Sequence, residues 1–320
     1  MKDMEERCLT SSAEAENGGS AKGPSESNFA SAVIYVDDDA AQYRDSAVQM
    51  ADEMAAMFKT YEIVVVDDGC AHGAADAVAD ALAIHPLSIV RMGNHQGLES
   101  AMNAGVDASV GDYVFEVDDL GALDVSFVRS AYAEAMSGAD VVNGVFADGS
   151  SLRGKLFYGM FNRFSGYPTK LASSPCCLLS RRAVNRVRSM NGYAPYRKAS
   201  YAASGLRIAE VKVAGHATRK TDLGMAVTSL ALYTDAFYKV AFWLAALMAV
   251  LSLAEVIYVA VIAASGIAVE GWVTTMLAMT VGFMAVFVLF AFALKYLDLL
   301  VKITFEKQGY LTDGIERPAQ

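Results

Sequence analysis

Residues 61–69 read Tyr-Glu-Ile-Val-Val-Val-Asp-Asp-Gly. A short β-branched apolar run that ends in two acids and a glycine is typical of a buried strand followed by a turn. The sequence predicts strands at Ala32–Val36, Glu62–Val66, Ser88–Met92 and Tyr113–Val117. Alanine-rich stretches between them predict helices at Ala47–Phe58, Ala74–Ile84 and Leu98–Ala108. Strands alternating with helices predict a doubly wound, mostly parallel α/β sheet that is covered on both faces.

Acidic residues follow three of the predicted strands. They are Asp37-Asp38-Asp39, Asp67-Asp68 and Asp118-Asp119. Because ligands bind at the carboxyl ends of the strands in such sheets, we expect these acids to lie at one edge. The pattern indicates a site that holds a cation or ribose hydroxyl groups.

The net charge of -10 conceals an uneven distribution. Residues 29–150 carry 4 basic and 21 acidic side chains, whereas residues 151–220 carry 14 basic and 1 acidic. We therefore divide the chain into a polar tail (1–28, expected to be disordered and cytoplasmic), an acidic domain (29–150), a basic juxtamembrane segment (151–238) and an apolar C-terminal part (239–320). The basic segment lacks an RNA-binding pattern, so we expect no nucleic-acid partner.

Two apolar stretches near the C-terminus are long enough to cross a membrane. Trp272–Leu294 contains no charged residue, and Val240–Ser265 contains only Glu255. At about 1.5 Å per residue each spans a hydrocarbon core of about 30 Å, which predicts a transmembrane hairpin. Lysines flank its outer ends, so the positive-inside rule places both termini in the cytoplasm of an inner-membrane protein. A glutamate within a span is expected to face the other helix or another subunit, which makes a homo-oligomer a hypothesis.

The basic segment has two interpretations. Arg153, Lys155 and Arg163 flank apolar residues spaced at 3–4 positions, which is typical of an amphipathic helix at a membrane surface. Arg181 and Arg182 would extend this cationic surface toward anionic lipids or a lipid phosphate. Alternatively, these charges form an ordinary solvated face.

Several sequence blocks in order resemble family 2 glycosyltransferases. The first is Asp67-Asp68-Gly69, followed by Asn94-His95-Gln96-Gly97-Leu98, Ala101-Met102-Asn103-Ala104-Gly105, Gly111-Asp112-Tyr113-Val114-Phe115 and Asp118-Asp119. Further blocks resemble the membrane-anchored polyprenyl-phosphate branch, similar to bactoprenol glucosyltransferases and dolichyl-phosphate mannose synthase. These are Lys155-Leu156-Phe157-Tyr158, Phe161-Asn162-Arg163, Leu178-Leu179-Ser180-Arg181-Arg182 and Gly271-Trp272.

The resemblance implies a GT-A type fold and the transfer of a hexose from a UDP- or GDP-sugar to polyprenyl phosphate in cell-envelope synthesis. It implies that Asp37, Asp67, Asp68, Gly69 and Gly97 bind the nucleotide. Asp118 and Asp119 would be catalytic and would hold Mg²⁺ or Mn²⁺ against the diphosphate. The expected partners are the nucleotide sugar, the polyprenyl phosphate and the membrane.

The sequence departs from the family pattern at several positions. The usual Asp-x-Asp is altered, because an ungapped alignment places Leu120 on the second aspartate, which leaves Asp119 or Glu116 as a substitute ligand. Ser174-Pro175-Cys176-Cys177 stands where relatives carry Gly-Asp-Phe-Arg, so the acid proposed to be catalytic there is missing. These changes support an alternative, a catalytically degenerate relative that acts as a binding or scaffolding subunit in envelope-glycan assembly.

Overall fold

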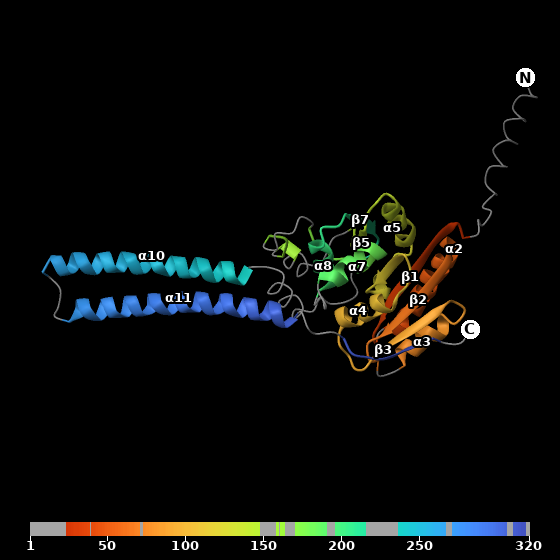
Figure 1. Cartoon of the computed structure of the whole chain (residues 1–320), viewed down its shortest axis with the longest axis horizontal. Coiled ribbons are helices and arrows are strands. Elements are labelled where there is room, and N and C mark those ends of the chain that lie inside the picture. The colour runs from red at the N-terminus through yellow and green to blue at the C-terminus, as the bar shows by residue number, and fades with distance from the viewer. Residues whose placement is uncertain are drawn as a thin grey trace, which may run out of the picture.

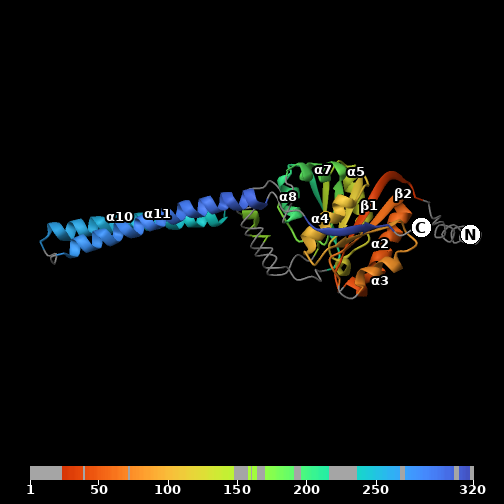
Figure 2. The ribbon, with the colours of Figure 1, turned by 60° about the horizontal axis from the view of Figure 1, so that its bottom comes forward.

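The computed structural model of the 320-residue chain combines an α/β part with two long helices that extend from it (Figures 1 and 2). It describes residues 24–38, 40–70, 73–147, 158–159, 161–163, 170–190, 196–215, 236–266, 271–305 and 310–317. The predicted tail at residues 1–28 therefore lies almost wholly outside the described residues. The same holds for most of the predicted amphipathic helix, including Arg153 and Lys155.

The first four strands form where the apolar runs predict them. They are β1 (Glu26–Val36), β2 (Phe58–Asp67), β3 (Leu87–Met92) and β4 (Tyr113–Val117). The alanine-rich stretches form α2 (Arg44–Met57), α3 (Ala74–Ala81) and α4 (Leu98–Ala108), and short 3-10 turns occur at η1 (Ala40–Tyr43) and η2 (Leu120–Ala122). The remaining elements of this part are α5 (Phe127–Met136), β5 (Val141–Phe146), β6 (Cys176–Ser180), α7 (Arg181–Met190), α8 (Arg197–Ala203), β7 (Ile208–Val213) and β8 (Thr312–Glu316).

The strands form one eight-stranded sheet in the order β7-β5-β6-β4-β1-β2-β3-β8. Strands β1 to β4 pair in parallel, as the βα alternation predicts. In contrast, β6 runs antiparallel to both β4 and β5, and β8 runs antiparallel to β3. The mixed α/β sheet confirms the predicted fold class.

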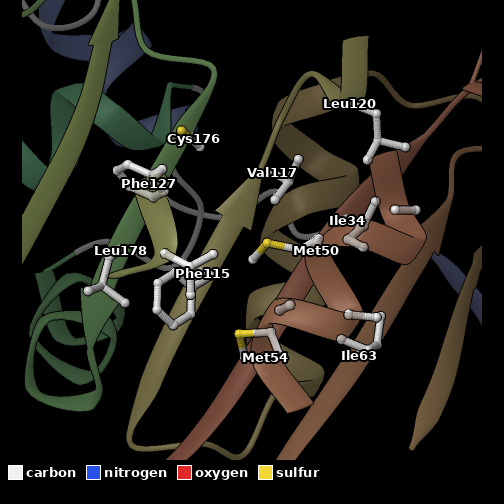
Figure 3. Close-up of a cluster of buried hydrophobic side chains, with 14 of the residues drawn as sticks. Ile34, Met50, Met54, Ile63, Phe115, Val117, Leu120, Phe127, Cys176 and Leu178 are labelled. Carbon is white, nitrogen blue, oxygen red and sulfur yellow. The ribbon is translucent and has the colours of Figure 1, made fainter. Parts of the chain in front are cut away.

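Helices cover both faces of the sheet, and each face has its own hydrophobic core. On one face α2, α3 and α5 pack over a cluster that includes Met50, Met54 and Phe115 (Figure 3). On the other face α4, α7 and α8 pack over a cluster that includes Met102, Val184 and Tyr201. Because both faces are buried, the central strands are apolar over most of their length rather than alternating.

The sheet uses strands from well beyond residue 150. Strands β6, β7 and β8 come from the segments that the sequence analysis assigned to the basic and C-terminal parts. The predicted boundary at residue 150 therefore divides the sheet. Strand β8 returns to the sheet edge after the long helices, so the C-terminal end of the chain lies beside β3 (Figure 1).

Helices α10 (Ala236–Ala264) and α11 (Trp272–Phe305) lie side by side and reach away from the sheet (Figures 1 and 2). Their apolar windows, Phe242–Ala264 and Trp272–Leu297, are long enough to span a membrane. Most of their large side chains are exposed, including Trp243, Leu289 and Phe292. Glu255 is also exposed. The pair is consistent with the predicted hairpin, and α11 continues further than expected.

Candidate functional site at the carboxyl edge of the sheet

The acids predicted from the sequence gather at one edge of the sheet. The register pairs Val36 of β1 with Asp67 of β2, and Ile34 of β1 with Val117 of β4. Asp37, Asp68 and Asp118 each come next after one of these strand ends. The parallel strands therefore bring three separate acidic segments together, as the strand-end argument predicts.

Asp68 joins the ends of β1, β2 and β3 through a buried carboxylate. Its Oδ1 accepts a hydrogen bond from the backbone N–H of Gln96 at 2.8 Å. Its Oδ2 accepts from the Gly97 N–H at 3.0 Å and from the Tyr35 hydroxyl at 2.7 Å. The His95 Nδ1 atom lies 2.9 Å from the same oxygen. Asp68 therefore fixes the loop that contains residues 95–97, and the predicted nucleotide contact stays a prediction.

Glycine at position 69 is required by the close approach of this loop. Gly69 has φ +75°, and a Cβ built there would lie 2.7 Å from the His95 backbone nitrogen and 2.9 Å from the Asn94 carbonyl carbon. Gly97 also has a positive φ, of +86°. The glycine of the Asp-Asp-Gly motif thus allows the loop to reach the carboxylate of Asp68.

Asp67 faces the other way, toward β3. Its Oδ1 accepts from the Cys70 N–H at 2.9 Å, and its Oδ2 lies 3.0 Å from Arg91 Nη1. Arg91 also pairs with Asp76 and with Glu316 of β8, which links the C-terminal strand to this loop. Burial and the neighbouring Asp67 raise the pKa of the Cys70 thiol to about 12.

A buried charge cluster surrounds Asp118. We name it the Asp118 cluster, and its members are Glu99, Glu116, Asp118, Arg197 and Lys198. Arg197 is 1% exposed, and its guanidinium donates to Glu99 Oε2 at 3.0 Å, Glu116 Oε1 at 2.8 Å and Asp118 Oδ1 at 2.8 Å. Lys198 Nζ lies 2.7 Å from Asp118 Oδ2. Both carboxylate oxygens of Asp118 are therefore paired with cationic side chains.

The pKa values in the Asp118 cluster follow from burial and pairing. Burial by itself raises the pKa of Asp118, but Arg197 and Lys198 outweigh it and lower the pKa to about 2. Burial raises the pKa of Glu116, and the Arg197 charge opposes this only in part. Glu116 Oε1 also accepts from the Tyr201 hydroxyl at 2.7 Å, whereas its Oε2 is buried with no hydrogen-bond partner among the described residues.

Asp119 is buried at this edge, at 7% exposed, and it caps η2. Its Oδ1 accepts from the Gly121 N–H at 3.1 Å. Mg²⁺ in nucleotide sites usually takes one or two carboxylates together with phosphate oxygens, so Asp119 fits such a cation in kind. Asp118 fits less well, because its oxygens already have cationic partners. Within the described ranges, no group of three or more His, Cys, Asp or Glu side chains could hold a metal.

The two predicted lipid-phosphate residues of α7, Arg181 and Arg182, do not lie at the acidic edge. Ser180, at the end of β6, pairs with Tyr113 at the start of β4, so α7 begins at the opposite edge of the sheet. Arg181 donates to the carbonyl oxygens of Gly111 at 2.8 Å and Ser109 at 3.1 Å. The Arg181 guanidinium thus binds main-chain carbonyls, and its predicted part in a cationic surface stays a prediction.

Arg182 lies near Arg181 but is largely exposed, with a distant contact to Asp140 at 3.7 Å. It lines an open cavity of about 750 Å³ together with Asn185, Arg186, Ser204, Gly205 and Leu206. Arg163 is exposed on a short described segment, and Arg153 and Lys155 lie outside the described residues. Of the predicted lipid contacts that the structure describes, Arg181 and Arg182 lie at the edge opposite to Asp118.

Sequence reasoning missed Glu99, Arg197, Lys198 and Tyr201 of the acidic edge. Arg197 and Lys198 belong to a helix whose neighbouring residues are small or aromatic, Ala199, Ser200, Tyr201 and Ala202. Two adjacent cations at the start of such an apolar helix are a signal of a buried ion pair, since unpaired charges are rarely buried. Their partners lie 79 to 98 positions earlier in the chain, which no local pattern specifies.

A comparison with protein families finds a match to part of this domain. The family model described as glycosyl transferase family 2 matches residues 45–188. That range is less than half of the chain, runs from α2 into α7, and contains Asp67, Asp68, Asp118 and Asp119 of the edge. No curated protein matches the chain.

Three solved structures are similar to the chain at low identity. The mannosyltransferase PcManGT from Pyrobaculum calidifontis, in complex with GDP-Man and Mn²⁺, has 15% identity and a TM-score of 0.47, with 94% of each chain covered. Glucosyl-3-phosphoglycerate synthase from Mycobacterium tuberculosis, with Mn²⁺ and UDP-glucose, has 15% identity and a TM-score of 0.46, covering 64% of this chain and 78% of that one. Mannosyl-3-phosphoglycerate synthase from Rubrobacter xylanophilus has 17% identity and a TM-score of 0.44, covering 62% and 70%.

Proposed function

We propose that the protein transfers a hexose from a UDP- or GDP-sugar to polyprenyl phosphate at the cytoplasmic face of a membrane. The observation that carries the proposal is the family 2 match over residues 45–188, the segment whose strand ends place Asp68 and Asp118 at one edge. The family match supports a glycosyltransferase but does not identify the sugar donor or the acceptor, which are part of this proposal.

The donor half of the proposal rests on the acidic edge. The loop that Asp68 fixes, with Gly69 in close approach to Asn94 and His95, would give the nucleoside a rigid backbone surface. An edge this acidic repels a diphosphate unless a cation lies between them. We propose Mg²⁺ or Mn²⁺, held by Asp119 and by the diphosphate oxygens. When bound, such a cation stabilises the negative charge on the departing nucleoside diphosphate.

The acceptor half rests on the two long apolar helices. Exposed side chains such as Trp243 and Phe292 would leave a large apolar surface in water, and a bilayer removes that cost. A phosphate monoester has a second pKa of about 6, so at pH 7 it is mostly a dianion and attacks the anomeric carbon without a strong base. Attack from the face opposite the nucleotide inverts that carbon. We propose that Arg153, Lys155 and Arg163 contact the lipid phosphate at the membrane surface.

The test is nucleoside diphosphate release by the purified full-length protein in detergent. The reaction contains polyprenyl phosphate, Mg²⁺ or Mn²⁺, and a panel of UDP- and GDP-sugars. We expect release with at least one donor, and at least a hundredfold less with Asp119→Asn. Release that never exceeds the level without acceptor, for any donor in the panel, would overturn the proposal.

A second candidate is a non-catalytic binding or scaffolding subunit in envelope-glycan assembly. The observation that favours it is the pairing of both Asp118 oxygens with Arg197 and Lys198. Calorimetric titration with UDP and GDP, with and without Mn²⁺, separates the two candidates. Binding of a nucleotide supports the transferase, and absence of binding in every condition supports the scaffold.

A further inference from the structure

Lys198 pairs with Asp118, the carboxylate to which the family resemblance assigns a metal ion. Its ammonium nitrogen lies 2.7 Å from Asp118 Oδ2, and the Arg197 guanidinium lies 2.8 Å from Oδ1. Asp118 is 5% exposed and Lys198 is 6% exposed, so this is a buried pair rather than a surface contact. The carboxylate that would ligate a cation is already neutralised from inside the protein.

The two cations of the cluster differ in how firmly they are held. Arg197 donates to three carboxylates and its backbone N–H donates to Glu99 Oε2 at 2.9 Å. Lys198 contacts only Asp118 and the Ser174 carbonyl among its described partners. A lysine also has a flexible four-carbon stem, whereas the planar guanidinium is fixed by its several hydrogen bonds. Lys198 is therefore the member of the cluster that can leave Asp118 at the lower cost.

A divalent cation and Lys198 cannot both bind Oδ2 of Asp118. Direct coordination needs a lone pair of that oxygen at about 2.0–2.2 Å, and it would bring the metal next to the ammonium charge. Asp119, the adjacent carboxylate, is also buried at 7% exposed, and its Oδ1 accepts from the Gly121 N–H. The geometry thus separates a carboxylate paired with lysine from one that caps η2.

We propose that Lys198 is an internal competitor for the metal ion. A divalent cation gains Asp118 as a ligand only when the Lys198 ammonium moves away, and until then it has Asp119 and the donor diphosphate alone. This inference rests on the proposed function, because it concerns the cation of the nucleotide site. It makes position 198 the residue that sets metal affinity in the absence of donor.

Direct Mn²⁺ binding to the full-length protein in detergent tests this, with loss of the free-ion EPR signal as the readout. We expect Lys198→Met to bind Mn²⁺ at least tenfold more tightly than the unmodified protein. Lys198→Arg, which keeps the charge, should leave the affinity within twofold. The double variant Lys198→Met with Asp118→Asn should lose the gain. Equal affinity of the Lys198→Met variant and the unmodified protein would overturn the inference.

A second Mn²⁺-binding measurement uses the Asp118→Asn variant alone. This measurement does not depend on the folding of the Lys198→Met variant. If Lys198 already blocks Asp118, this substitution changes Mn²⁺ affinity less than twofold. A tenfold weakening would show that Asp118 ligates the metal with Lys198 in place, and the inference would fail. Because no sugar donor is present, these results stand apart from the transfer assay. A protein that shows the Mn²⁺ gain but no turnover would refute the proposed function and support the competition.

Discussion

The Gln96 side chain forms two hydrogen bonds with the main chain of Leu311, 215 positions later in the sequence. Its Nε2 donates to the Leu311 carbonyl at 2.6 Å, and its Oε1 accepts from the Leu311 N–H at 3.0 Å. The backbone N–H of Gln96 also donates to Asp68. The segment that follows the apolar helices is thus attached directly to the loop of the candidate nucleotide site.

The first prediction concerns this attachment. Gln96→Ala removes both hydrogen bonds to Leu311, which we expect to weaken the pairing of β8 with β3. At about 0.5–1.5 kcal/mol for each bond, amide hydrogen exchange at Thr312–Glu316 should accelerate by roughly tenfold. Gln49→Ala, on the exposed side of α2, is the matched control and should leave that exchange unchanged. Unaltered exchange in both variants would show that β8 is held by other contacts.

The second prediction concerns the Asp118 cluster. Arg197→Met leaves Glu99, Glu116 and Asp118 buried without their shared partner, which typically costs about 3–5 kcal/mol. We expect a clear fall in the denaturant concentration at the unfolding midpoint, as measured by near-ultraviolet circular dichroism. The control is Arg182→Met, whose side chain is 76% exposed and whose nearest acid is 3.7 Å away, and it should cost less than about 0.5 kcal/mol. Similar midpoints for the two variants would contradict the burial of the cluster.

The third prediction concerns the glycine of the Asp-Asp-Gly motif. Gly69→Ala introduces a Cβ against the backbone of Asn94 and His95 at a position with φ +75°. Gly73→Ala has a similar backbone conformation, φ +66°, but its nearest neighbour is a side-chain oxygen at 3.8 Å. Both variants carry the strain of a positive φ, so their difference isolates the steric clash. We expect the free energy of unfolding of Gly69→Ala to be about 1–3 kcal/mol lower than that of Gly73→Ala, as measured by denaturant titration.

The fourth prediction concerns the thiol of Cys70. Burial and the nearby Asp67, Asp38 and Asp37 carboxylates raise its pKa from 9.0 to about 12. Because the thiolate is the reactive form, at pH 8 its population is roughly a thousandfold lower than that of an unperturbed thiol. The rate at which iodoacetamide modifies Cys70 should therefore be at least about a hundredfold lower than the rate at which it modifies the glutathione thiol. Peptide mass spectrometry follows the reaction of Cys70. Asp67→Asn should speed the modification, and a rate near that of glutathione in the unmodified protein would refute the prediction.

Local pattern was sufficient for the elements that build the acidic edge. The apolar runs before Asp37, Asp67 and Asp118 form β1, β2 and β4, and the alanine-rich stretches form the helices between them. Parallel pairing then follows from the alternation of strand and helix, and it places the acids together. The two long apolar helices also appear where continuous hydrophobicity predicts them.

The function of the basic segment was harder to predict, because a cationic composition does not specify which edge of the sheet each side chain reaches. Arg181 and Arg197 lie 16 positions apart in one cationic stretch, yet they lie at opposite edges of the sheet. Strand β6 runs antiparallel to β4, so the residues that follow it leave the acidic edge. Helix α8 then begins at that edge again and brings Arg197 to Asp118.

The strands, the helices, the acidic strand ends and the apolar hairpin follow from local sequence, because each depends on the periodicity and hydrophobicity of neighbouring residues. The cations that neutralise Asp118, the partners of Arg181 and the pairing of β8 with β3 follow only from the folded chain. These features depend on contacts between segments about 70 to 225 positions apart. Such contacts are fixed by strand direction and by the need to pair buried charges, which a local pattern does not record.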